Sequence, residues 1–297
     1  MIGPIETLRD TANSWECDEN DHINIKSYAR RFDDAVRAFL VEARWQIPHR
    51  TSRLIRFHAE LRGGEPVNGT TAIVAIDGGQ VALEHRLYAS HRMVNGEPLL
   101  SATALDLLPD VEREDLSAFD LTSASADALP KTGGLDANQT LHVSGLDRLP
   151  VTYKGVVPND AFGPEAESTN GPRLNDHYLV GIISDAATHI WAEAGATDDW
   201  LRERGWGRAA VQLRLRYGTR PQAGDVVDIR SAIVAFTRKT VSYRHLIVNQ
   251  MTETVIAEAT ITSLMLDLSA RRAMPWPDEN LKHLHQKVAE FDESYSS

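Results

Sequence analysis

The chain has 297 residues, enough for one large domain or two ordinary ones, and its 42% hydrophobic content is typical of a folded globular protein. No stretch approaches the roughly 18 apolar residues that a membrane-spanning helix requires. The formal net charge of −11 disfavours nucleic acid and anionic lipid, so we expect neither as a partner. A polyanionic ligand would need a local basic patch, for which the pairs Arg238-Lys239 and Arg271-Arg272 are candidates.

The first fifteen residues contain acidic side chains and no apolar run, unlike a secretory signal, and we therefore expect a cytoplasmic protein. The single cysteine, Cys17, excludes an internal disulfide and a multi-cysteine metal site. Histidines on the predicted strands lack metal-ligand spacing, so we expect no metal. There is no P-loop, and Gly205 to Ala210 matches a dinucleotide-binding fingerprint only formally, because a strand follows it instead of a helix. No cofactor is expected.

The first element with a clear pattern is a helix around residues 28–40. Its apolar residues recur at helical spacing and form one face: Tyr28, Phe32, Ala35, Val36, Phe39 and Leu40. Tyr28 belongs to this face, so core packing explains it better than ligand contact. Four stretches with strand composition follow, at residues 54–61, 70–76, 81–90 and 99–107, separated by turns rich in glycine and asparagine.

Residues 109–149 are rich in Asp, Ala, Ser and Gly, which indicates a surface connection between two domains. We expect an N-terminal domain at residues 1–135 and a C-terminal domain at residues 136–297.

The second half repeats the order of the first. A helix around residues 179–190 precedes strands at 211–217, 226–236, 241–248 and 254–268, and a short polar helix is expected at 278–291. The offset between matched positions rises slowly, from 142 residues (Asp18 to Asp160) through 151 (Phe32 to Ile183) to 155 (Gly69 to Gly224). A slowly growing offset is what one duplication with a few insertions produces.

A short acidic motif precedes the first helix. It reads Asp18-Glu-Asn-Asp21-His22-Ile-Asn24 and is followed by Tyr28, and it resembles the Asp-x-x-Gly-His-x-Asn-x-x-x-Tyr signature of the 4-hydroxybenzoyl-CoA thioesterase and acyl-ACP thioesterase families. Asp21 replaces the glycine of the signature, and aspartate tolerates the positive φ that such a position can require. The resemblance implies an α+β fold, a double hot-dog, with two copies of a long central helix wrapped by an antiparallel β-sheet.

The residues of this motif fit thioester hydrolysis, which needs an activated water or a carboxylate nucleophile and a polarised carbonyl. Asp18 could be the general base or the nucleophile, and His22 could orient Asp18 or the thioester. The N-terminus of the helix offers N–H groups and the positive end of a dipole to an oxyanion. Asn24 could hold the water, but a residue of its type before a helix is equally well explained as a cap. Asp18 lies farther from the helix, so capping explains it less well.

The second half carries only part of the motif. Asn159-Asp160-Ala-Phe-Gly163 keeps Asp-x-x-Gly, which makes Asp160 a candidate counterpart of Asp18, but Pro164 stands where the histidine is expected. We therefore expect one competent site per chain. In the families that this chain resembles, hot-dog domains pair, which implies a homodimer or a higher homo-oligomer.

A basic turn in the second half is the candidate CoA-binding segment. Arg238, Lys239 and Thr240 stand between two predicted strands, where flexible cations could hold phosphates. An ordinary solvated turn explains them equally well.

Two other functions stay open. A hot-dog enoyl-CoA hydratase or dehydratase uses a similar Asp-x-Asn-Pro-x-His motif, whose proline is absent here. The chain could also be a non-catalytic acyl-CoA-binding module. Neither the acyl chain nor the choice between CoA and acyl carrier protein follows from the sequence.

Overall fold

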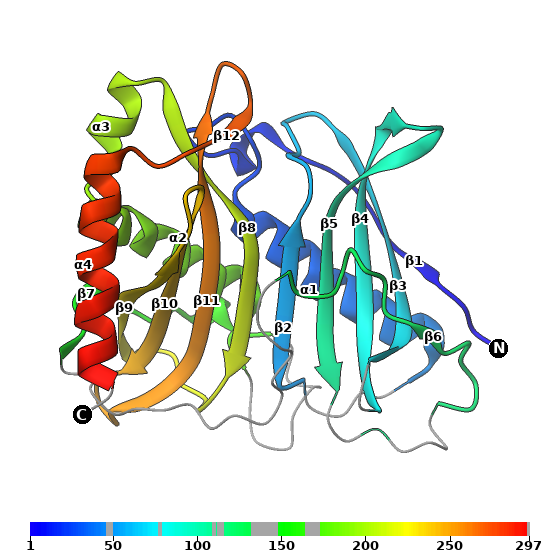
Figure 1. Cartoon of the computed structure of the whole chain (residues 1–297). Coiled ribbons are helices and arrows are strands. Elements are labelled where there is room, and N and C mark those ends of the chain that lie inside the picture. The colour runs from blue at the N-terminus through cyan, green and yellow to red at the C-terminus, as the bar shows by residue number, and fades with distance from the viewer. Residues whose placement is uncertain are drawn as a thin grey trace. The chain divides into compact units, whose positions relative to one another are not determined.

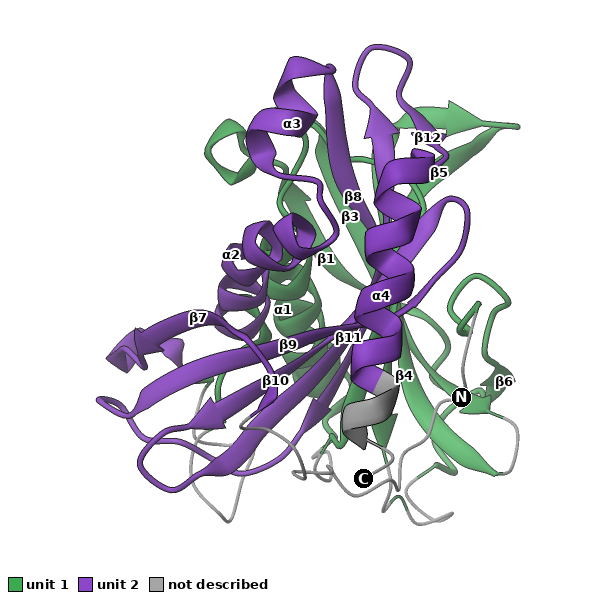
Figure 2. Cartoon of the chain, turned by 60° about the vertical axis from the view of Figure 1, so that its left-hand side comes forward, with its two compact units in different colours: residues 1–139, 163–177 green, residues 140–162, 178–297 purple. Residues whose placement is uncertain are grey.

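A computed structural model describes residues 1–45, 50–76, 79–108, 111, 116–131, 148–163 and 173–295 (Figure 1). The chain divides into two compact units, Met1–Gln139 with Gly163–His177, and Thr140–Phe162 with Tyr178–Ser297 (Figure 2). The expected domain limit between residues 135 and 136, like most of the expected linker, lies outside the described residues.

Unit 1 is an antiparallel sheet with one long helix. Its strands pair in the order β1-β3-β4-β5-β2, and the short β6 pairs in parallel with the end of β3. The elements are β1 (Ile5–Thr11), the 3-10 helix η1 (Ser14–Glu16), α1 (Ile25–Ala43), β2 (Ser52–Phe57), β3 (Pro66–Ile76), β4 (Gln80–Val94), β5 (Glu97–Leu108) and β6 (Thr122–Ser123).

Unit 2 has an equivalent strand order, β7-β9-β10-β11-β8, with β12 paired to β11. The elements are β7 (Val151–Val156), η3 (Asn159–Ala161), α2 (Asp176–Glu193), α3 (Asp198–Glu203), β8 (Trp206–Tyr217), β9 (Val226–Phe236), β10 (Thr240–Asn249), β11 (Thr254–Asp267), β12 (Arg272–Met274) and α4 (Asp278–Tyr295). The first two residues of α2 cluster with unit 1. The predicted α+β class with antiparallel strands is confirmed.

Helix α1 forms where its apolar spacing predicts it. The predicted face is buried at Tyr28, Phe32, Ala35, Val36 and Phe39, and it packs against β1, β3 and β4 (Figure 1). Leu40 is only partly buried. The helix ends at Arg44, which has a positive φ of 51° and donates its N–H back to the last turn.

Both faces of the unit 1 sheet are covered, because alternate residues of its strands point to opposite sides. Ile73 and Leu83 cluster with Val36 and Phe39 of α1. Their neighbours Val74 and Ala82 belong to a second cluster, which includes Ala128 from the segment after β6. This explains why these strands contain nearly continuous apolar runs instead of a strict alternation.

Each unit contains a buried chain of three hydrogen-bonded polar side chains, and the two chains lie on equivalent strands. In unit 1, Thr7 bonds to Thr71 (2.7 Å between hydroxyls), and Thr71 bonds to Nδ1 of His85 (2.8 Å). In unit 2 the corresponding members are Thr152, Ser231 and His245, with 2.6 Å at both steps. Burial lowers the pKa of His245 to about 3, so its ring is neutral. The same buried network in both units supports an origin by duplication.

Removing the central hydroxyl should destabilise either unit. Thr71→Val keeps the shape of the side chain, and Ser231→Ala removes one atom, but each leaves a buried imidazole nitrogen without its partner. We expect each to lower the free energy of unfolding by about 1–3 kcal/mol, measured by urea denaturation. Ser242→Ala, which breaks a half-buried hydroxyl pair on the same sheet, is the control and should cost less. Equal losses of unfolding free energy in Ser242→Ala and in the two variants would show that the buried histidine does not add to the cost.

Candidate active site

The acidic motif forms a closed loop between η1 and α1. Its two ends are joined because the N–H of Asn24 donates to the carbonyl of Glu16 (2.8 Å). One step farther along, Cys17 and Ile23 form a β-bridge, and the N–H of Asp18 donates to the carbonyl of His22 (2.9 Å). Asp18 and His22 therefore face each other across the loop.

The tip of this loop needs the backbone geometry expected from the motif. The N–H of Asp21 donates to the carbonyl of Asp18 (3.1 Å), which closes a tight turn. Asp21 has a φ of 60°, the left-handed conformation in which aspartate is tolerated. The prediction that Asp21 can take the place of a glycine is confirmed.

Asp18 and His22 form a largely buried pair. Oδ2 of Asp18 lies 3.3 Å from Nδ1 of His22, and their side chains are 15% and 11% exposed. The N–H of Asn20 donates to Oδ1 of Asp18 (2.9 Å) and fixes the carboxylate. Among the described residues, the buried Nε2 of His22 has no hydrogen-bond partner. The pair thus leaves one imidazole nitrogen of His22 without a bond from the described part of the chain.

Asn24 is the N-cap of α1. Its Oδ1 accepts the N–H of Lys26 (3.0 Å), and its backbone is extended. Between the two roles expected for Asn24, the structure shows the capping one. Capping places the positive end of the α1 dipole two residues from His22 in the sequence.

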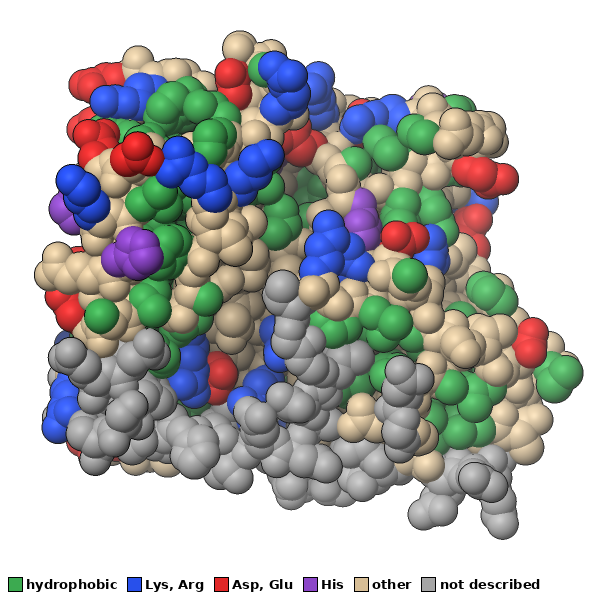
Figure 3. All heavy atoms as spheres, viewed as in Figure 1, with side chains coloured by type: hydrophobic (Ala, Val, Ile, Leu, Met, Phe, Trp, Pro, Cys, Tyr) green, Lys and Arg blue, Asp and Glu red, His purple; other side chains and the backbone are tan. Residues whose placement is uncertain are grey.

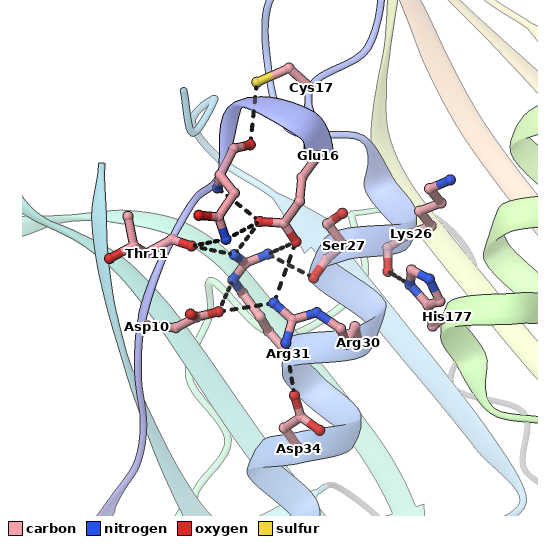
Figure 4. Close-up of polar contacts among 11 residues, drawn as sticks. Asp10, Thr11, Glu16, Cys17, Lys26, Ser27, Arg30, Arg31, Asp34 and His177 are labelled. Carbon is pink, nitrogen blue, oxygen red and sulfur yellow. Dashed lines mark hydrogen bonds and ion pairs between the residues drawn. The ribbon is translucent and has the colours of Figure 1, made fainter. Parts of the chain in front are cut away.

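A group of charged residues holds the start of the loop against α1 (Figure 4). The fully buried guanidinium of Arg31 binds both carboxylate oxygens of Glu16, at 3.1 and 2.7 Å. Arg31 also pairs with Asp10 (3.1 Å) and, like Arg30, lies beside Glu16. Burial by itself would raise the pKa of Glu16, but the hydrogen bonds from Arg31 and Asn13 and the charges of both arginines lower this pKa to about 2.

This low pKa predicts an acid-sensitive contribution to stability. The folded value of about 2 lies below the reference of 4.5, so the contribution is present above about pH 4.5 and is lost as the pH falls toward 2. We expect Glu16→Gln to flatten this part of the curve of unfolding free energy against pH, measured by urea titrations. If the unfolding free energy of Glu16→Gln falls with pH as steeply as that of the wild type, the expectation is wrong.

Tyr28 is a core residue, as its helical spacing predicts. It is 4% exposed, and its hydroxyl accepts the N–H of Leu61 (3.1 Å) and lies 3.3 Å from the hydroxyl of Ser101. Burial raises the pKa of this phenol to about 12, so it stays neutral.

Asp160 lies in an environment unlike that of Asp18. It is exposed on η3, which follows β7 as η1 follows β1, so its place in unit 2 matches that of Trp15. Its assignment as a counterpart of Asp18 therefore rests on sequence alone. Asn175 directly precedes α2 as Asn24 precedes α1, and no role for it was predicted from the sequence. Asn24 and Asn175 are 151 positions apart, as are Phe32 and Ile183, so this offset could have identified Asn175 as the counterpart of Asn24.

The basic turn at Arg238, Lys239 and Thr240 joins β9 to β10. Oγ1 of Thr237 accepts the N–H groups of Lys239 and Thr240 and so fixes the turn. Arg238 pairs with Asp278 of α4 at 2.6 Å, whereas Lys239 is exposed. Figure 3 shows Lys and Arg side chains gathered around β12, which contains Arg272.

A second charged cluster was not predicted. Arg53 of β2 binds both oxygens of Asp106 (2.6 and 2.7 Å), and its Nη1 lies 2.8 Å from both Asp33 and Asp176. Arg53, Asp106 and Asp176 have fully buried side chains, and Arg50 joins them at 2.9 Å from Asp106. Burial would raise the pKa of Asp106, but the two arginines hold it well below its usual range.

Within the described residues, no group of three His, Cys, Asp or Glu side chains could hold a metal ion. None of the described helices is long and apolar enough to cross a membrane.

Residues 171–284 match the model of a family described as the thioesterase-like superfamily. The match covers most of unit 2 and begins after Asp160. No curated protein matches the sequence.

Solved thioesterases share the fold of nearly the whole chain. An acyl-ACP thioesterase from Bacteroides thetaiotaomicron has a TM-score of 0.59 at 8% identity, with 88% of this chain and 97% of that chain covered. The 12:0-ACP thioesterase from Umbellularia californica has a TM-score of 0.57 at 12% identity, with 91% of this chain and 94% of that chain covered. A Lactobacillus plantarum protein assigned as an oleoyl thioesterase has a TM-score of 0.56 at 13% identity, with 87% of this chain and 95% of that chain covered. At these identities the likeness shows a common fold, and the predicted resemblance to thioesterases is confirmed.

Proposed function

We propose that this chain hydrolyses acyl-CoA or acyl-ACP thioesters to a free acid and a thiol, at the loop before α1. The observation that carries the proposal is the buried Asp18–His22 pair, in which Nε2 of His22 has no hydrogen-bond partner among the described residues. The superfamily match of residues 171–284 and the fold shared with solved thioesterases support it.

Asp18 activates the attacking water, directly or through His22. When Nδ1–H of His22 donates to Asp18, the ring is held in the tautomer whose Nε2 has a lone pair. Nε2 can then take a proton from water while the water oxygen attacks the thioester carbon. The C–S bond breaks, the sulfur leaves with its electron pair, and the proton on the imidazole passes to the thiolate.

The start of α1 supplies the electrostatic part of catalysis. The carbonyl oxygen gains negative charge as water attacks, and the N-terminal end of a 19-residue helix carries partial positive charge. Asn24 caps this end through Lys26 and keeps it in place next to the loop of Asp18.

Phosphates of the thiol carrier are assigned to the basic turn before β10. Lys239 is its strongest candidate, because the charge of Arg238 is partly balanced by Asp278. Thr240 belongs to the same turn, where its N–H donates to Oγ1 of Thr237 and helps to fix the position of Lys239.

We further propose that each unit is one hot-dog copy and that only the first retains the chemistry. Two residues before Asn24 stands His22, whereas two residues before Asn175 stands Arg173, which cannot accept a proton at neutral pH. Six residues before these asparagines stand Asp18 and Thr169. The second copy of the motif therefore lacks both members of the pair.

A free-thiol assay with purified protein and a panel of acyl-CoA and acyl-ACP substrates tests the function. Thiol release with first-order dependence on enzyme supports hydrolysis. Loss of enoyl absorbance without thiol would make the chain a hydratase, and binding without either reaction would make it an acyl-CoA-binding module. Both of these outcomes would overturn the proposal.

A further inference from the structure

The loop that contains Asp18 and His22 is joined to the start of α1 by a backbone contact of Glu16 at its base. The carbonyl of Glu16 accepts the N–H of Asn24, and Asn24 in turn begins α1. Glu16 therefore connects the first residue of the loop to the residue that caps the helix.

The side chain of Glu16 is held by α1 itself. Arg31 lies two helical turns after Asn24 and binds both carboxylate oxygens of Glu16. Its Nη1 also donates to the carbonyl of Ser27 (3.0 Å), so the guanidinium cannot rotate without breaking a contact within the helix. A planar guanidinium that binds both oxygens of a carboxylate fixes the orientation of that carboxylate as well as its distance.

Glu16 also ties the loop to the preceding strand. Its Oε2 accepts the N–H of Asn13 (2.9 Å), and Nη2 of Arg31 donates to the carbonyl of Thr11 (3.0 Å) at the end of β1. The strand, η1 and the first turns of α1 thus meet at one buried ion pair (Figure 4).

We propose that Arg31 and Glu16 are positioning residues for hydrolysis, which hold the Asp18–His22 pair at the start of α1 through the backbone contact between Glu16 and Asn24. The inference rests on the proposed function for its kinetic consequence. Small displacements of a reacting group from its productive geometry lower turnover steeply, so the pair should affect kcat more than substrate binding.

Glu16→Gln is the primary test, because glutamine keeps the size of the side chain and an acceptor for Asn13 but removes the ion pair. We expect kcat to fall by about tenfold to a hundredfold with KM changed by less than about twofold. Arg31→Lys, which keeps the charge but loses the two-pronged contact, should show the same split. Asp34→Asn is the matched control, because Asp34 pairs with Arg30 of the same charged group at 3.2 Å, and the substitution removes an equal charge without touching the Arg31–Glu16 pair. It should leave kcat within about twofold.

A second readout is independent of turnover. The ¹⁵N signals of the His22 ring, assigned with His22→Gln, should shift in Glu16→Gln and Arg31→Lys but not in Asp34→Asn. If the wild type hydrolyses no thioester, the proposed function fails, yet these shifts still decide whether the ion pair positions His22. An unchanged His22 spectrum in Glu16→Gln, or equal losses of kcat in Glu16→Gln and Asp34→Asn, would overturn the inference.

Discussion

Asp18→Asn is expected to lower kcat for thioester hydrolysis by about two to four orders of magnitude, the usual contribution of a general base. Asparagine keeps the shape of the side chain and can still accept the N–H of Asn20, but it cannot take a proton or stabilise a protonated His22. Steady-state thiol release, together with titration of a bound substrate analogue, separates loss of chemistry from loss of binding. Binding should stay within about threefold, because the proposal gives Asp18 no role in holding the carrier.

Asp21→Asn is the control for that experiment. It removes an equal charge from the same loop, and asparagine tolerates the φ of 60° at this position. We expect turnover close to that of the wild type. Wild-type turnover by Asp18→Asn would refute a catalytic role for Asp18, and equal losses in both variants would trace the effect to the net charge of the loop.

Arg53→Met is expected to lower the free energy of unfolding by about 3–5 kcal/mol, as removal of one partner from a buried ion pair does. Methionine fills most of the space but leaves the buried carboxylate of Asp106 without its two-pronged partner. Arg50 remains 2.9 Å from Asp106 and moderates the loss. Urea denaturation at neutral pH measures the change.

The same substitution at an exposed pair provides the comparison. Arg9 pairs with Glu6 at 2.8 Å, but their side chains are 76% and 47% exposed, so Arg9→Met should cost about 0–1 kcal/mol. A small loss for Arg53→Met would mean that the buried charges contribute little beyond the space they fill.

Local patterns in the sequence predicted much of the fold. The apolar spacing from Tyr28 to Phe39 located α1, and strand composition located β9 at its observed limits, residues 226–236. Strands β1 and β7 gave no such signal. Thr7 is the only buried residue of β1, and Thr152 the only buried residue of β7, so neither strand shows an apolar alternation.

The candidate site was predictable where its residues are close in sequence. Asp18, His22 and Asn24 lie within seven positions, and the structure brings the first two into contact. The cluster of Arg53, Asp106 and Asp176 was not predictable, because its members are 53 and 123 positions from Arg53 and each alone resembles a surface charge. Arg31 was missed for a similar reason, since an arginine within a helix is ordinarily solvated.

The location of the reaction is tested most directly by a crystal structure with a CoA thioether ketone, an analogue that keeps the carbonyl but cannot be hydrolysed. We expect its carbonyl carbon beside Asp18 and His22 at the start of α1, with one analogue bound per chain. An analogue bound at the start of α2, next to Arg173 and Asp176, would contradict this account.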